Sequence, residues 1–200
     1  MKVLPNHIYI IPPNKNVVIV GNELILSSRI NRVGIINMPI DYFFRSLAIA
    51  RTEMPIGVIL SGTGSDGSVG LRAIKEAGGL TFVQDSTAKY QNMPKSAIAE
   101  GVVDYVLAPE NIAEEIALLG DHHHHHHHLV NDLELNEKQI LKDDYLKKII
   151  TELHRLVGMD FSKYKITTLG RRIARRMLVN KKKTTKEYLD YITGNAAEAE

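Results

Sequence analysis

The stretch GVILSGTGSDGSVGLRAIKEAGG, residues 57–79, decides the fold. An apolar run over 57–60 leads into a glycine-rich turn, and residues 68–77 then follow a helical pattern that stops at two glycines. We therefore expect a buried strand, a tight turn and a helix in that order. This succession is the unit from which parallel sheets are built.

The same alternation continues downstream. Strands are predicted at 80–84 and 102–107, and helices are predicted over 93–101 and 109–120, each opening near a proline and closing on a glycine. Strands that alternate with helices predict a parallel sheet covered on both faces.

Upstream, the pattern favours strands. Residues 7–11 form an apolar run stopped by two prolines, and 17–26 reads as a hairpin whose two-residue turn is Gly21-Asn22. A helix is expected from 38 to 51, with Phe44 on its apolar face.

The alternation stops at Asp121, where seven consecutive histidines begin at residue 122. Three helices are predicted beyond it, at 146–157, 168–179 and 185–192. The expected fold class is α/β: a partial doubly wound, mostly parallel sheet followed by a small all-α unit. The expected divisions are a first unit at 1–120, a histidine-rich linker at 121–144 and a helical unit at 145–200.

Composition excludes several chemistries. The chain of 200 residues contains no cysteine, which removes disulfides, thiolate zinc sites and cysteine nucleophiles. No apolar run approaches the ~18 residues of a membrane span, so we expect a cytoplasmic protein without direct membrane insertion. Charge is uneven: residues 1–120 hold 10 Lys and Arg against 11 Asp and Glu, whereas 161–191 hold 10 against 2.

The glycine turn leaves three interpretations open. Gly62, Gly64 and Gly67 fit the G-x-G-x-x-G pattern of dinucleotide-binding turns, and Asp85 lies 18 residues beyond the last of them. Asp66 argues against a nucleotide, because a carboxylate at the mouth of a helix repels phosphates. It could instead cap the helix that begins at Ser68, or serve as a catalytic acid that orients an imidazole.

Four segments in order, PNHIYIIPPNK, MPIDYFFRSLA, GVILSGTGSDGSVGLRAIKEAGG and MPKSAIAEG, resemble the C-terminal half of the chemotaxis methylesterase CheB over residues 3–119. The resemblance implies a Ser-His-Asp triad that hydrolyses methyl esters on receptor glutamates. It implies that Asp66 is the triad aspartate and that Thr63 lies near the oxyanion site. No residue here matches the nucleophilic serine or the catalytic histidine of that family, His7 included. We therefore expect this chain alone to be inactive, without a cofactor or metal of its own.

Arg171, Arg172, Arg175 and Arg176 are expected to share one face of a helix, opposite an apolar stripe. This face could be solvated, could contact an anionic protein, or could bind nucleic acid. The last is disfavoured, because no aromatic or amide side chains are interleaved with the arginines.

The segments FSKYKITTLGRRIARRM and TTKEYLDYI resemble the N-terminal helical domain of CheR, the receptor glutamate methyltransferase, over 160–200. The resemblance implies that the arginines contact the acidic cytoplasmic helices of methyl-accepting chemoreceptors, and that an S-adenosylmethionine-binding domain follows residue 200. The two resemblances in this order imply a fused CheB–CheR hybrid.

The histidine run would bind transition metals weakly, and a purification tag or a natural linker explains it as well. Our leading hypothesis is a segment of a bifunctional receptor-modifying enzyme. The alternatives are a non-catalytic adaptor that docks on acidic receptor helices and, behind it, a nucleotide-binding module.

Overall fold

The protein forms two compact units, Met1–Leu118 and Leu119–Glu200, each with a hydrophobic core of its own. The computed structural model describes residues 1–29, 36–50, 54–125, 140–141, 143–161, 164–195 and 198.

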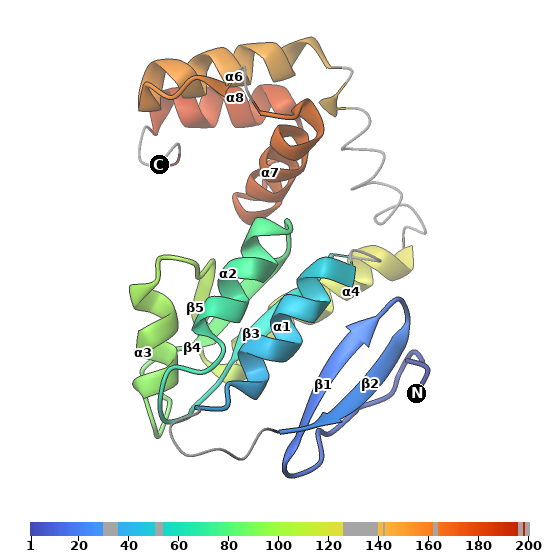
Figure 1. The fold of residues 1–200 in the computed structure, drawn as a ribbon. Coiled ribbons are helices and arrows are strands. Elements are labelled where there is room, and N and C mark those ends of the chain that lie inside the picture. The colour runs from blue at the N-terminus through green and yellow to red at the C-terminus, as the bar shows by residue number, and fades with distance from the viewer. Residues whose placement is uncertain are drawn as a thin grey trace. The chain divides into compact units, whose positions relative to one another are not determined.

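The first unit opens with a hairpin. Strands β1 (Lys15–Val20) and β2 (Glu23–Ser28) pair antiparallel with Val20 opposite Glu23, which leaves the predicted two-residue turn. Gly21 has a φ of +58°, the left-handed conformation that this turn position requires. The hairpin lies beside helix α1 (Pro39–Ala50), where the Ser46 hydroxyl accepts the Ile19 amide at 3.0 Å (Figure 1).

A parallel sheet of three strands follows, in the order β3 (Ile56–Ile59), β4 (Leu80–Gln84) and β5 (Tyr105–Leu107). Every residue of the central strand β4 is buried. A strand buried on both faces is expected where helices cover a parallel sheet on each side.

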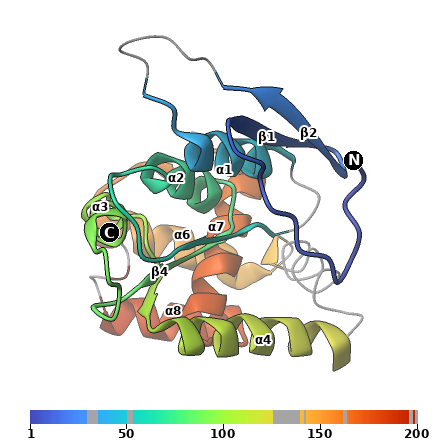
Figure 2. The ribbon, with the colours of Figure 1, turned by 90° about the horizontal axis from the view of Figure 1, so that it is seen from below.

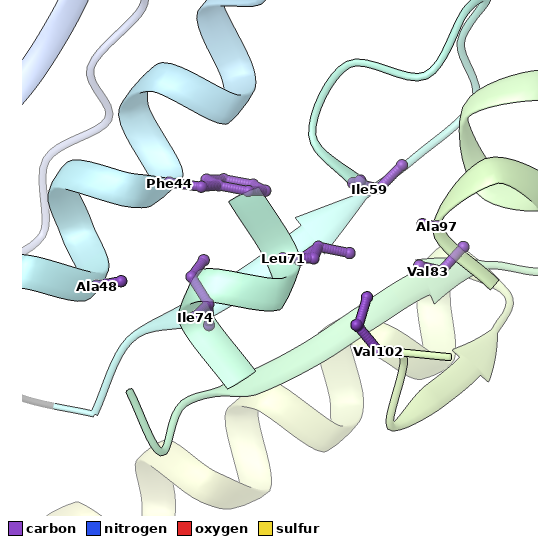
Figure 3. Close-up of a cluster of buried hydrophobic side chains, with 8 residues drawn as sticks. All are labelled: Phe44, Ala48, Ile59, Leu71, Ile74, Val83, Ala97 and Val102. Atoms are coloured by element: carbon purple, nitrogen blue, oxygen red, sulfur yellow. The ribbon is translucent and has the colours of Figure 1, made fainter. Parts of the chain in front are cut away.

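Helices α2 (Ser68–Glu76), α3 (Asn92–Ala99) and α4 (Pro109–His125) complete this alternation. The core between α1, α2, α3 and the sheet is made by Phe44, Ala48, Ile59, Leu71, Ile74, Val83, Ala97 and Val102 (Figure 3). Helix α4 lies on the other face of β4 from α2 (Figure 2). The α/β class and its parallel sheet are confirmed.

Two of the predicted elements were wrong. Residues 7–11 form no strand, and Ile8 and Ile10 are 93% and 87% exposed, because no described strand pairs with this segment. A β-rich composition is not sufficient without a neighbouring strand. Helix α4 does not end at Gly120 but continues to His125, because a glycine within a helix weakens it without breaking it.

The second unit is helical, as predicted. It contains α6 (Asp144–Val157), α7 (Ile166–Val179) and α8 (Thr185–Gly194). Asp143 caps α6 by accepting the Tyr145 amide at 2.9 Å, and its second oxygen accepts the Thr185 hydroxyl at 2.5 Å, which ties α6 to α8. In the described part of the chain, no helix has both the length and the apolar character needed to cross a bilayer.

Candidate functional site

Asp66 lies in the loop that joins the carboxyl end of β3 to α2. The flanking glycines Gly64 and Gly67 have φ values of +83° and +97°, so this loop has a backbone that few other residues adopt. A Cβ on Gly67 would lie 2.8 Å from Ile59 and 2.9 Å from Ile40. The glycines therefore let the loop close against both β3 and the start of α1.

The carboxylate of Asp66 caps helix α1. Its Oδ2 accepts the Ile40 amide at 3.0 Å, and its Oδ1 accepts the Asp41 amide at 2.9 Å. Pro39 opens this helix and has no N–H, so these two amides are the first donors that the helix presents. A carboxylate in this position is favoured by the positive end of the helix dipole.

This geometry rules out one of the three interpretations left open for the glycine turn, in which Asp66 caps its own helix at Ser68. The N-cap of α2 is Gly67, which has no side chain to offer. The amide of Gly70, in the first turn of α2, is instead accepted by Oδ1 of Asp41 at 2.6 Å. Sequence analysis missed Asp41, although an acid two residues after the proline that opens a helix was a signal that could have indicated it.

The loop that carries Thr63 is attached to the loop that follows β4. The Gly62 amide donates to the Tyr90 carbonyl at 2.9 Å, and the Ser61 hydroxyl accepts the Tyr90 amide at 2.9 Å. Thr63 itself is exposed at this end of the sheet. Thr63 and Asp66 thus belong to one glycine-rich loop at the carboxyl end of β3, the edge where α/β proteins carry their sites.

Asp85 follows β4 on the same edge of the sheet. Its Oδ1 accepts both the Thr87 hydroxyl, at 2.6 Å, and the Thr87 amide, at 3.0 Å. The hydroxyl contact, followed by the amide contact, lowers the pKa of the Asp85 carboxyl from its usual value. Asp85 therefore acts as the cap of a local turn.

The four arginines of α7 do not share one environment. Arg172 is exposed and Arg171 is partly exposed, but Arg175 is only 5% exposed. The prediction of a single exposed arginine face is therefore wrong for Arg175. Arg175 belongs to the buried residues of α7, together with Ile173, Ala174 and Met177, so the periodicity of the apolar positions did not mark the limit of the buried face.

Arg176 is held by an acid. Its Nε and Nη2 donate to the two carboxylate oxygens of Glu198 at 2.7 and 2.5 Å, a bidentate pair whose carboxylate is 5% exposed. Oε1 of Glu198 also accepts the Asn180 amide group at 2.7 Å and the Tyr188 hydroxyl at 3.3 Å. Burial, and then the nearby Glu198 charge, raise the pKa of Tyr188 well above its usual range.

Among the described residues, no three His, Cys, Asp or Glu side chains lie close enough together to hold a metal ion. Residues 126–128 of the histidine run lie outside the described residues.

Comparison with known families assigns both units. The model of the CheB methylesterase family matches residues 1–116, and the model of the all-α domain of CheR methyltransferases matches 144–200. The chain therefore belongs to the CheB methylesterase family, and it carries a CheR-type all-α domain fused behind the methylesterase part.

Individual relatives agree with this assignment. An uncharacterized 104.1 kDa protein of Rhodobacter capsulatus is 30% identical over 99% of this chain and 22% of its own length. A protein-glutamate methylesterase/protein-glutamine glutaminase of Rhizobium meliloti is 37% identical over 58% of this chain and 33% of its own. The catalytic domain of Thermotoga maritima CheB is 28% identical, with a TM-score of 0.52, over 60% of this chain and 65% of that domain. The chain thus spans less than two thirds of each of these relatives.

Proposed function

We propose that the first unit is part of a protein-glutamate methylesterase and that Asp66 is its catalytic acid. The carboxylate lies on the edge of the sheet where such sites are found, and the first two amides of α1 hold it in place. Each carboxylate oxygen has about two acceptor positions, so one N–H on each oxygen leaves room for the N–H of an imidazole. The proposal rests on this remaining capacity of the Asp66 carboxylate to accept hydrogen bonds. Thr63, on the same loop, is proposed to lie near the oxyanion.

The chemistry requires more than this chain supplies. In ester hydrolysis by a Ser-His-Asp triad, the acid orients the histidine, and the histidine takes the proton from the serine that attacks the ester carbonyl. We propose that the histidine and the serine are supplied by sequence upstream of Met1 in a longer parent. We propose that the 200-residue chain alone releases no methanol from a methyl ester.

The arrangement at α2 disfavours the nucleotide alternative. A dinucleotide site needs the first amides of the helix for pyrophosphate. Here the Gly70 amide is already bonded to the Asp41 carboxylate, whose negative charge opposes a phosphate.

The helical unit is proposed to contact acidic receptor helices through Arg172. It is an exposed guanidinium on α7, and a guanidinium forms bidentate contacts with carboxylates. This contact would serve either an active hybrid enzyme or the adaptor alternative. The cofactor S-adenosylmethionine is proposed only for a methyltransferase domain in the parent.

Methanol release from a methyl-esterified receptor fragment tests the enzymatic proposal. The measurement compares the 200-residue chain with the same chain extended by the upstream coding sequence of its gene. We expect activity in the extended protein alone, and a fall of roughly 10⁴-fold on Asp66→Asn, because the histidine loses its orienting partner. Activity that survives this substitution would refute the assignment of Asp66, and an inactive extended protein that folds would favour the adaptor.

A further inference from the structure

The two helices beside the candidate acid cap each other. Asp66, in the loop before α2, accepts the first two amides of α1, and Asp41, in the first turn of α1, accepts the Gly70 amide of α2. These bonds close a ring that runs from Asp66 through the start of α1 to Gly70 and back along the α2 backbone. Each helix therefore depends on the other for its N-terminal cap.

The Asp41 carboxylate is the buried member of this ring, in a residue that is 7% exposed. A carboxyl group removed from water needs hydrogen-bonding or dipolar partners for its oxygens. The Gly70 amide, at 2.6 Å, and the positive end of the α2 dipole supply them. This short bond joins the start of α1 to the first turn of α2.

Contact between the helices leaves this bond little freedom. A Cβ on Gly70 would lie 2.6 Å from the Phe44 Cβ and 3.0 Å from the Asp41 Cα. The backbone of α2 therefore rests directly on α1 at this point. We therefore expect a change in the Asp41–Gly70 bond to shift the start of α1, and with it the amides that hold Asp66.

We propose that Asp41 is a positioning residue for Asp66. It does not reach the reacting groups but orients the acid through the amides at positions 40 and 41. This inference rests on the proposed function of Asp66. It differs from a purely structural role, in which Asp41 would stabilise α2 and leave the Asp66 carboxylate where it is.

The test is an NMR pH titration of the 200-residue chain, in which the amide protons at positions 40 and 41 report on the carboxylate they contact. Asp66→Asn should remove the part of their acid titration that the Asp66 carboxylate causes, and so assigns that part. Asp41→Ala should reduce its amplitude to half or less, because the amides move away from Asp66. Asp41→Asn keeps an oxygen acceptor for Gly70 and should restore most of the amplitude. The matched control is Asp85→Ala, which removes a carboxylate cap from another loop and should leave both amides unchanged.

Two results would overturn the proposal. One is an unchanged titration amplitude at positions 40 and 41 in a folded Asp41→Ala variant. If that variant does not fold, amide hydrogen exchange in Asp41→Asn decides the question. A neutral acceptor bonds more weakly than a carboxylate, so the Gly70 and Ile40 amides should exchange faster by the same factor. Faster exchange at Gly70 with unchanged exchange at Ile40 would contradict the coupling.

These measurements are independent of esterase activity. If the extended protein hydrolyses esters without Asp66, the proposed function fails while the coupling of Asp41 to Asp66 can still be observed. If the coupling fails, Asp66 keeps its proposed catalytic role but is oriented by its own loop.

Discussion

Both units shelter carboxylates from water, but they give them different partners. In the methylesterase-like unit, Asp66 and Asp41 accept backbone amides at the starts of helices. In the helical unit, Glu198 accepts side chains, above all the guanidinium of Arg176. Backbone amides carry no net charge, so an acid that they bind can still attract a further positive partner. An acid that binds an arginine instead neutralises the positive charge of that arginine. The basic segment therefore offers a receptor less positive charge than its composition indicates.

The largest effect on stability is expected at Arg175 of the helical unit. Arg175→Glu should lower the free energy of unfolding of the helical unit by about 3–5 kcal/mol, because it places an opposite charge in a site that is 5% exposed. Arg172→Glu, on the same helix but exposed, should leave stability unchanged and weaken binding to an acidic receptor peptide. Urea unfolding followed by circular dichroism, with peptide titration, measures both. Equal stability of the two variants would contradict the assigned burial.

In the first unit, the corresponding disruption is steric. Gly70→Ala should destabilise this unit by about 1–3 kcal/mol, because the added Cβ meets Phe44 at 2.6 Å. The control is Gly194→Ala in α8, where a Cβ meets nothing within 4 Å. This change should stabilise the helical unit by up to about 1 kcal/mol, since alanine loses less backbone entropy in a helix. Hydrogen exchange of the two units reports each effect separately.

Features that depend on local backbone could be predicted from the sequence. The Gly21 turn, the strand–turn–helix around Asp66 and the end of α2 near Gly78 follow from conformations that glycine adopts at low cost. The structure also explains why each of the three positions of the G-x-G-x-x-G pattern is a glycine. Gly64 and Gly67 have positive φ, and a Cβ on Gly62 would lie 2.2 Å from the Met93 sulfur. The pattern located the loop that carries Asp66, although the same glycines also suggested a nucleotide.

Features that depend on partners distant in the sequence could not be predicted. Asp66 bonds amides more than twenty residues upstream, so local pattern favoured the nearer cap at Ser68. Glu198 reaches Arg176 from 22 residues downstream, and periodicity alone could not show that this arginine is engaged. The segment 7–11 shows the same limit for strands, because the residues specify β propensity but not a neighbour to pair with.

Substitution of Glu198 tests the Glu198–Arg176 pair through its acid. Glu198→Ala should destabilise the helical unit by about 2 kcal/mol, because it leaves Arg176 without its bidentate partner and Tyr188 without an acceptor. The guanidinium of Arg176 is still 31% exposed, so the loss should be smaller than for a fully buried pair. Glu152→Ala, which breaks the Glu152–Arg155 pair within α6, is the control and should cause no measurable change. A loss as small as that of the control would show that Glu198 does not hold Arg176 in solution.

The smallest expected effect is a dependence on alkaline pH that only the helical unit should show. Burial and the charge of Glu198 raise the pKa of Tyr188 in the folded state above its unfolded value near 10. The stability that the neutral phenol contributes is therefore complete below pH 10 and is lost as pH rises towards the folded pKa. Between pH 9 and 11 we expect a loss of about 1 kcal/mol, since each pH unit between the two pKa values costs at most about 1.4 kcal/mol.

The control is Tyr188→Phe, which removes the titrating group and should flatten this dependence. The hydrogen exchange of the sheet amides in β4 should follow the same pH course in both proteins. A slope that persists in Tyr188→Phe would assign the dependence to groups other than Tyr188.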